Sequence, residues 1–465
     1  MKITKPEQVT YERIDMPVPV RLGCIPEVGE KVYQERLNRL RSRMREEQLD
    51  AAVIYGDREH FQNFEYFYGF EPRFEEGIAV ISREGECFAI LGNECLPLTK
   101  IAKVDVRPVL CQLLSMANQP MDRETDLKKC FEECKVTQGS RAGVVGWKLF
   151  TEEQRDLFDI PFYIVQALKS AVGLDGDVRN INDMLIEPEK GMRNQTEIEQ
   201  AANFEYFTSA VSAGMLDAME NLEVGKTELE IAAYLNPCGL PLSCHTNVSA
   251  GERTLTGLVS PTDHRMHLGD PVTICWGMRG ALSCRAGYLA EGKADLPKGA
   301  QNYMESLVKF YFAAAVSWYE NIGLGVKGGD LYRMIEEIFP KEKYGWVLNP
   351  GHGIGSEEWM NSPIFKNSEF CIRSGQMLQL DIIPESKGGC YTCNIEDGIL
   401  IADESLRREI ADQYPQIWER IQRRKSYMRE VLGICLKEET LPLYETQGIL
   451  NPYLLNKGYA MVKNN

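Results

Sequence analysis

The sequence lacks an excess of basic residues, and this limits its partners. Among its 465 residues, 68 are acidic and 52 are Lys or Arg, which gives a net charge of −16. A chain with this charge repels phosphate backbones, so we do not expect nucleic acid to be its main partner. Apolar residues make up 44% and charged residues 26% of the chain. These proportions are typical of a folded globular protein and exclude a disordered chain.

The sequence also lacks a long apolar run. The most apolar helical stretch, residues 308–319, is interrupted by Lys309 and is too short to span a bilayer. The N-terminal residues 1–6 contain no apolar core like that of a signal peptide. We therefore expect no membrane segment and a cytoplasmic location.

A regular cysteine framework is missing as well. The fourteen cysteines are scattered, which favours reduced thiols over disulfides in a chain of this size. Cys390 and Cys393 have the spacing of a redox or zinc motif. They lie in a predicted strand, where residues three apart point to opposite faces, and no second pair of this kind occurs. We expect no functional role for this pair.

The length predicts two domains, because 465 residues are too many for one typical core. Residues 1–185 alternate strand and helix signals, with a buried strand at 51–55 and a hairpin around 83–85, and contain no catalytic group of residues. Residues 186–465 form the second domain. Its predicted helices are 195–220, a helix opened by the capping box Thr227–Glu230, 301–321, 330–339 and 404–431, and its predicted strands are 271–276, 281–289, 376–383, 389–393 and 395–402.

Several motifs of the second domain resemble those of the creatinase, prolidase and aminopeptidase P superfamily. The motifs are Gly191-Met192-Arg193, Pro261-Thr262-Asp263, Gly351-His352-Gly353-Ile354-Gly355 and Asn394-Ile395-Glu396-Asp397. The resemblance implies an α+β protein with a creatinase-like N-terminal α/β domain and a C-terminal domain of the pita-bread fold. It also implies a homodimer.

Hydrolases of this family hold two divalent metals with two aspartates, one histidine and two glutamates, and the resemblance assigns each position here. Cys275 occupies the first aspartate position, and the second falls at Ala286, or at Arg285 if the register shifts by one. The histidine is retained as His352. The first glutamate is replaced by Asp381, and the second is retained as Glu396.

This pattern predicts a site with fewer metals than is usual for the family. His352, Asp381 and Glu396 are expected to bind one divalent metal, either zinc, manganese or iron, or to work without metal. Cys275 is available as a fourth ligand, which would favour zinc. Without metal, His352 would act as a general acid or base, with Glu396 as its charge partner.

Three residues around this centre are expected to contact the substrate or take part in the reaction. Cys275 is either a nucleophile, with His352 as its base, or a buried structural cysteine. Arg279 lies an even number of residues from Cys275, so on a regular strand it would face the same side and bind a substrate carboxylate, unless it is a solvated arginine at the sheet edge. Trp359 stands where the family has a second histidine and is expected to contact substrate.

The sequence favours a hydrolase, or an enzyme of lyase type, that cleaves a C–N bond in a small carboxylate- or amide-bearing metabolite. A metal-dependent Xaa-Pro aminopeptidase or dipeptidase acting on short peptides is the first alternative. A non-catalytic binding or scaffold protein is the second. His245, His264 and His267 lie in loops ahead of the first predicted ligand strand, where His264 or His267 could line a substrate opening.

Overall fold

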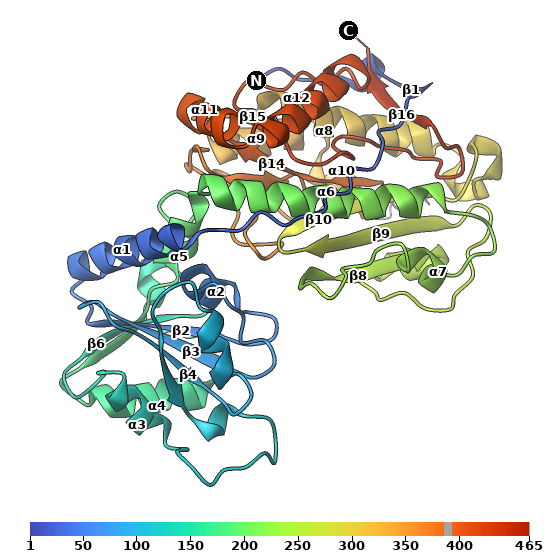
Figure 1. Cartoon of the computed structure of the whole chain (residues 1–465). Coiled ribbons are helices and arrows are strands. Elements are labelled where there is room, and N and C mark those ends of the chain that lie inside the picture. The colour runs from blue at the N-terminus through green and yellow to red at the C-terminus, as the bar shows by residue number, and fades with distance from the viewer. Residues whose placement is uncertain (386–392, 465) are drawn as a thin grey trace. The chain divides into compact units, whose positions relative to one another are not determined.

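The computed structural model describes residues 1–385 and 393–464, which form two compact units (Figure 1). One unit is Val28–Asn194, and the other combines Met1–Glu27 with Gln195–Asn465. The sequence grouped residues 1–185 together, but the first 27 residues pack with the C-terminal part of the chain. The reason is a two-stranded sheet in which β1 (Val9–Arg13) pairs antiparallel with β16 (Tyr459–Lys463).

The unit Val28–Asn194 is built around a six-stranded mixed sheet in the order β5-β4-β3-β2-β6-β7. The predicted strand at 51–55 forms β2, inside the sheet, and the predicted hairpin around 83–85 forms β3 and β4. Helices α3 and α4 share one apolar core with the sheet. The strands are β2 (Ala51–Gly56), β3 (Gly77–Ser82), β4 (Cys87–Leu91), β5 (Arg107–Leu110), β6 (Arg141–Val145) and β7 (Asp177–Asn180), and the helices are α1 (Glu30–Glu46), α2 (Gln62–Tyr68), α3 (Leu127–Glu133), α4 (Phe162–Val172) and α5 (Asp183–Ile186).

The larger unit contains two four-stranded antiparallel sheets, in the orders β13-β10-β9-β8 and β11-β12-β14-β15. The first consists of β8 (Leu242–Ala250), β9 (Pro271–Met278), β10 (Ala281–Tyr288) and β13 (Asn394–Glu396). The second consists of β11 (His352–Gly353), β12 (Met377–Gln379), β14 (Gly398–Ile401) and β15 (Thr440–Pro442). Only Asp397 separates β13 from β14, so one short segment passes from the first sheet to the second.

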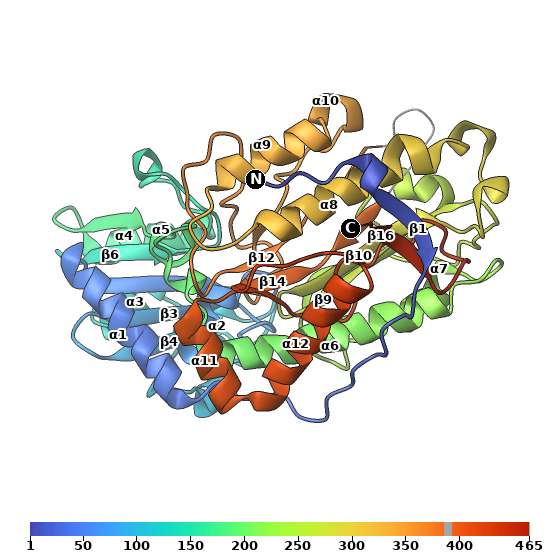
Figure 2. The ribbon, with the colours of Figure 1, turned by 90° about the horizontal axis from the view of Figure 1, so that it is seen from above.

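Helices cover these two sheets, as the view from above shows (Figure 2). Helix α8 is buried along its whole length after its first two residues, because an apolar helix must bury every side. Helix α6 packs against β9 and β10 and contributes to a second apolar core. The helices are α6 (Ile198–Glu220), α7 (Glu228–Ala232), α8 (Lys309–Asn321), α9 (Gly328–Ile338), α10 (Lys341–Tyr344), α11 (Glu404–Gln413) and α12 (Pro415–Glu430).

Local sequence signals explain one helix start in this unit and one helix that was predicted wrongly. The capping box is confirmed, since Thr227 and Glu230 exchange hydrogen bonds at the start of α7. The single helix predicted at 404–431 is wrong. It divides into α11 and α12 at Tyr414, because the residue before a proline is disfavoured in helical conformation and Pro415 begins the next helix. The predicted strand 389–393 lies almost wholly outside the described residues.

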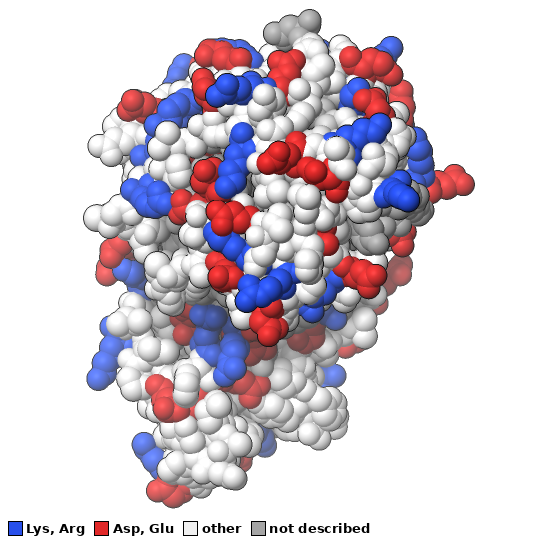
Figure 3. Space-filling view, turned by 90° about the vertical axis from the view of Figure 1, so that its right-hand side faces the viewer, with Lys and Arg blue, Asp and Glu red and all other residues white. Residues whose placement is uncertain are grey.

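Two further properties concern the helices and one face of the surface. No helix in the described part of the chain combines the length and the apolar character needed to cross a bilayer. On the face drawn in Figure 3, Lys and Arg side chains are interspersed with Asp and Glu, and no broad positive patch is formed there. A mixed surface of this kind gives no electrostatic footprint for a nucleic-acid backbone on that face.

Candidate active site

Four polar side chains from both sheets and one loop converge in the interior of the larger unit. Nε2 of His352, on β11, lies 3.1 Å from Oε1 of Glu358. The same nitrogen lies 3.9 Å from Oδ2 of Asp381 and 3.9 Å from Oε1 of Glu396. Asp381 follows β12 by one residue, and Glu396 ends β13. The predicted set of His352, Asp381 and Glu396 is therefore brought together, and Glu358 joins it.

The backbone around His352 holds the imidazole in place. β11 pairs with β12 so that His352 lies opposite Gln379, whose Nε2 donates a hydrogen bond to Oε1 of Glu396 at 2.8 Å. Gly351 has a φ of +135°, and a Cβ atom there would lie 2.8 Å from the carbonyl oxygen of Gln379. Only glycine fits this close approach without strain. The glycine next to His352 thus allows the histidine to meet the acidic residues of the other strands.

The charge balance of this cluster requires either protonated carboxylates or a bound cation. Burial lowers the pKa of His352, but Glu358, then Glu396 and Asp381, outweigh it and raise the pKa to about 10. Burial, followed by the charge of Glu396, raises the pKa of Asp381 well above its usual range, and burial also raises the pKa of Glu396. One imidazolium can neutralise only one of three carboxylates. The other two must take up protons or share a bound cation.

The donor atoms fit a divalent metal. One ligand atom each from His352, Asp381 and Glu396 lies within 4.8 Å of the others. Oδ1 of Asp381 is buried and makes no hydrogen bond. Buried polar atoms normally have a partner, so this oxygen indicates a missing one. One imidazole and two carboxylates suit zinc, manganese or iron.

The sequence did not predict a role for Glu358, although it predicted that the neighbouring Trp359 contacts the substrate. The ring of Trp359 stacks on His352, with centroids 4.1 Å apart and planes 17° from parallel. Trp359 remains 38% exposed, so it covers the histidine and still offers a surface to solvent. The side chain of Glu358 is 22% exposed and connects the buried cluster with solvent. Its position directly before Trp359 was the only signal for it.

Cys284, which the sequence did not single out, lies beside the first predicted ligand position. β9 and β10 are joined by the two-residue turn Arg279–Gly280, and the register places Cys284 directly opposite Cys275. On its other side, Cys284 lies opposite Glu396. Ala286, one of the two positions predicted for the second aspartate, lies opposite Thr273 and Asn394 instead. Directly paired residues share one face of a sheet, so both cysteines face the same side as Glu396.

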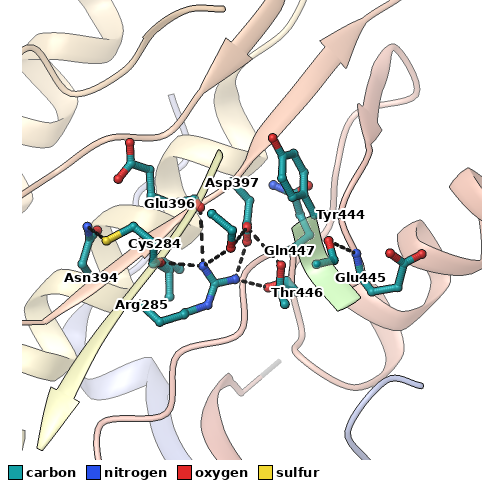
Figure 4. Close-up of polar contacts among 12 residues, drawn as sticks. Cys284, Arg285, Asn394, Glu396, Asp397, Tyr444, Glu445, Thr446 and Gln447 are labelled. Atoms are coloured by element: carbon teal, nitrogen blue, oxygen red, sulfur yellow. Dashed lines mark hydrogen bonds and ion pairs between the residues drawn. The ribbon is translucent and has the colours of Figure 1, made fainter. Parts of the chain in front are cut away.

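Arg285 extends toward Asp397 and Thr446, whereas the sulfur of Cys284 lies beside Asn394 (Figure 4). Its guanidinium forms a buried ion pair with Asp397 and donates to the carbonyl oxygen of Thr446 at 2.6 Å. Ser283 and Thr446 also donate to Asp397, at 2.8 and 3.0 Å. Neighbouring residues in a strand alternate between the two faces of the sheet. The side chains of Cys284 and Glu396 therefore lie on one face, and those of Arg285 and Asp397 lie on the other.

The prediction for Arg279 rested on a strand geometry that the structure does not have. β9 ends at Met278, and Arg279 occupies the turn with a φ of +45°. Its guanidinium lies over the ring of Phe207, 5.9 Å from the centroid. The adjacent Gly280 packs so tightly that a Cβ atom there would lie 1.8 Å from the carbonyl oxygen of Gly355. The even spacing from Cys275 therefore does not place Arg279 on the face of the acids.

The surroundings of Cys275 argue against a nucleophilic thiolate. Its thiol is buried, and a hydrogen bond with Cys284 followed by burial raises its pKa well above the usual range. A nucleophilic cysteine needs the opposite shift, from a neighbouring cation or helix N-terminus. His352 pairs with carboxylates instead and is not a base for this thiol.

The remaining candidates lie apart from the cluster. His264, His267 and Asp270 can place ligand atoms within 4.8 Å of one another, but they are partly exposed. His245 is exposed, and its Nε2 lies 3.0 Å from the carbonyl oxygen of Leu258. Cys393 is buried, whereas Cys390 lies outside the described residues, so the structure does not test that pair.

Comparison with family models matches both units. The model of the creatinase/prolidase N-terminal domain matches residues 36–94, and that of metallopeptidase family M24 matches residues 202–403. A search of curated protein sequences finds no match. The M24 match contains Cys275, Cys284, His352, Asp381 and Glu396.

Solved structures share the fold at low sequence identity. The prolidase from Pyrococcus horikoshii OT3 is 19% identical, with a TM-score of 0.61 over 79% of this chain and 95% of its own. The Xaa-Pro dipeptidase from Bacillus anthracis is 16% identical, with a TM-score of 0.61 over 80% of this chain and 96% of its own. The X-Pro aminopeptidase from Thermotoga maritima MSB8 is 18% identical, with a TM-score of 0.62 over 79% and 95%. The predicted α+β, two-domain fold is confirmed.

Proposed function

This chain belongs to the superfamily of creatinase, prolidase and aminopeptidase P, and from this premise we propose that it is a hydrolase that cleaves a C–N bond at the cluster around His352. The observation that carries the proposal is the convergence of one histidine and three carboxylates in the core, with Oδ1 of Asp381 left without a hydrogen bond. Such a group is costly to bury unless it serves a cation or a reaction.

His352, Asp381 and Glu396 would hold one divalent metal. A metal bound there supplies a hydroxide at neutral pH and polarises a carbonyl group. Gln379 fixes the orientation of the Glu396 carboxylate through its 2.8 Å hydrogen bond. Glu358 is placed to carry a proton between this centre and solvent, because its carboxylate touches His352 while its side chain remains partly exposed.

The substrate would be a small carboxylate- or amide-bearing molecule, with Trp359 forming one wall of its binding site. The exposed face of the indole suits an apolar or planar group of the substrate. Arg279 is not part of this proposal, because it lies in the hairpin turn beside Phe207. The protein would act in the cytoplasm as a homodimer.

A metal-dependent Xaa-Pro peptidase is the second candidate. It is favoured by the structural neighbours, which are a prolidase, an Xaa-Pro dipeptidase and an X-Pro aminopeptidase. The first family aspartate position holds Cys275, and neither residue predicted for the second, Ala286 or Arg285, is acidic, which sets this chain apart from the metal pattern that the resemblance implies for such peptidases.

The test uses the full chain purified without chelator. It is assayed on dipeptides with a C-terminal proline and on small amide and N-carbamoyl acids, before and after metal removal. We expect hydrolysis of a member of the second group, loss of that activity with the metal, and recovery on adding back a divalent ion. Hydrolysis restricted to the proline dipeptides would favour the second candidate. No hydrolysis by metal-loaded protein would contradict both.

Replacing Glu358 with glutamine should lower the rate of this hydrolysis by about 10- to 100-fold, the range found when a group supporting a metal ligand is removed. The amide keeps the size of the side chain but cannot accept a proton from the centre. The matched control is Glu357→Gln, one residue away, which should retain activity. Equal activity of the two variants would contradict the role of Glu358.

A further inference from the structure

A second group of donor atoms lies beside the histidine centre, and it consists mainly of sulfur. Across β8, β9, β10 and β13, the strand register places Asn247, Cys275, Cys284 and Glu396 in one row. Residues paired directly across strands project from the same face. Sγ of Cys275, Sγ of Cys284 and a carboxylate oxygen of Glu396 accordingly lie within 4.8 Å of one another.

The surroundings of these two sulfurs suit coordination. Nδ2 of Asn394 donates to Sγ of Cys284 at 3.2 Å, as the dashed line in Figure 4 shows. Tyr311 in turn donates to Oδ1 of Asn394 at 2.8 Å, which fixes the amide with its NH₂ group toward the sulfur. In metal sites, a ligand atom is commonly held in place by a hydrogen bond from a neighbouring group, and a further residue often orients that group. Cys275 and Cys284 are both buried.

A buried polar atom in the same row has no partner. Oδ1 of Asn247, opposite Cys275, is buried and makes no hydrogen bond. Cys244 also packs against the pair of cysteines. Two thiols, a carboxylate and an unpartnered amide oxygen together resemble a coordination shell more than an apolar core.

We propose that Cys275, Cys284 and Glu396 bind a thiophilic divalent cation, with zinc as the natural occupant. Thiolate ligands select zinc over the harder cations that carboxylates prefer. Binding deprotonates both thiols, because metal coordination releases their protons. Glu396 belongs to both donor groups, so it would bridge the sulfur site and the histidine site.

This site also explains why two cysteines are paired in a buried row without acting as nucleophiles. Both sulfurs are buried and lie close to a carboxylate oxygen of Glu396. A bound cation would hold the two sulfurs and this carboxylate together as ligands. The sulfur site goes beyond the proposed hydrolysis, which uses His352, Asp381 and Glu396, and it can exist whether or not that reaction occurs.

Cobalt(II) tests the proposal, because thiolate ligation gives a near-ultraviolet sulfur-to-metal absorption band that nitrogen and oxygen ligands do not give. Co²⁺ is added to metal-free full-length protein kept reduced with a phosphine, and Zn²⁺ is then titrated in as competitor. We expect the band in the unaltered protein and its loss on zinc binding. Cys275→Ser and Cys284→Ser should each remove the band and weaken zinc binding by about 100-fold or more.

Three further variants make the outcome specific. Cys371→Ser, at a half-buried cysteine of the same unit, should keep the band. His352→Ala should also keep it, which separates the sulfur site from the hydrolytic centre. The double variant Cys275→Asp with Cys284→Asp should bind Co²⁺ without the band. Absence of the band in the unaltered protein, its survival in both serine variants, or a Cys275–Cys284 disulfide that persists under the reductant would overturn the proposal.

The two proposals fail in different ways. A protein that shows the band but hydrolyses no substrate would keep the sulfur site and lose the proposed function. Hydrolysis supported by a divalent metal, without any sulfur band, would keep the function and remove the sulfur site.

Discussion

Replacing His352 with alanine should lower the rate of metal-supported hydrolysis by about 10³-fold, because loss of the metal removes on the order of 4 kcal/mol of transition-state stabilisation. His352 is fully buried, and its Nε2 lies within 3.9 Å of all three carboxylates. Without the imidazole, only Asp381 and Glu396 of the proposed ligands remain. The measurements are kcat/KM on the substrate identified and the metal content of the purified variant.

A second variant separates lost chemistry from lost packing, since Trp359 stacks on the ring that alanine removes. Asp381→Asn keeps the volume of the side chain and removes its charge, and it should lower kcat/KM to a similar extent with little change in thermal stability. His245→Ala, at an exposed histidine of the same unit, is the control and should retain activity. If Asp381→Asn retained full activity and metal, the assignment of this centre would be wrong.

Replacing Arg285 with methionine should lower the free energy of unfolding of the larger unit by about 3–5 kcal/mol, the cost of leaving one member of a buried ion pair without its partner. The two side chains are 2% and 0% exposed, so solvent cannot compensate Asp397. Burial already raises the pKa of Asp397, against the effect of Arg285 and two hydroxyl donors. Without the guanidinium, Asp397 should take up a proton or destabilise the strand. Urea denaturation followed by far-ultraviolet circular dichroism measures the loss.

Removing both members of the pair distinguishes a buried charge from a lost contact. Arg285→Met with Asp397→Leu should be more stable than Arg285→Met alone, because it leaves no uncompensated charge. Arg408→Met is the exposed control, since its partner Glu404 is also exposed on α11, and it should change stability by less than about 0.5 kcal/mol. A single variant as stable as this control would contradict the role of the pair.

Three residues of the histidine centre, His352, Asp381 and Glu396, could be assigned from the sequence because the resemblance to the family's motifs implies them. His352 is flanked by glycines that its strand pairing requires, and Glu396 lies in the Asn-Ile-Glu-Asp segment. Asp381 follows a short apolar strand. The α+β class and the hairpin of the first unit followed in the same way from apolar periodicity and turn residues. These features depend on interactions between near neighbours in the chain, which the sequence displays directly.

The tertiary structure determined which other residues lie next to the histidine centre. Cys284 could not be assigned from spacing, because the two-residue turn Arg279–Gly280 sets the register, and a shift of one residue reverses the face of every side chain. That register separates Cys284 from Arg285, which pairs with Asp397 on the opposite face. Glu358 approaches His352 through a loop fold that has no periodic signal.

The sequence by itself therefore determined the fold class, the family and three members of the buried centre. Only the tertiary structure showed that both cysteines join Glu396, that Arg279 occupies a turn, and that residues 1–27 pack with the C-terminal unit through β1 and β16. The physical reason is the same in each case. Strand register and pairing between distant segments are set by turn length and the packing of the whole unit, which single-sequence patterns do not contain.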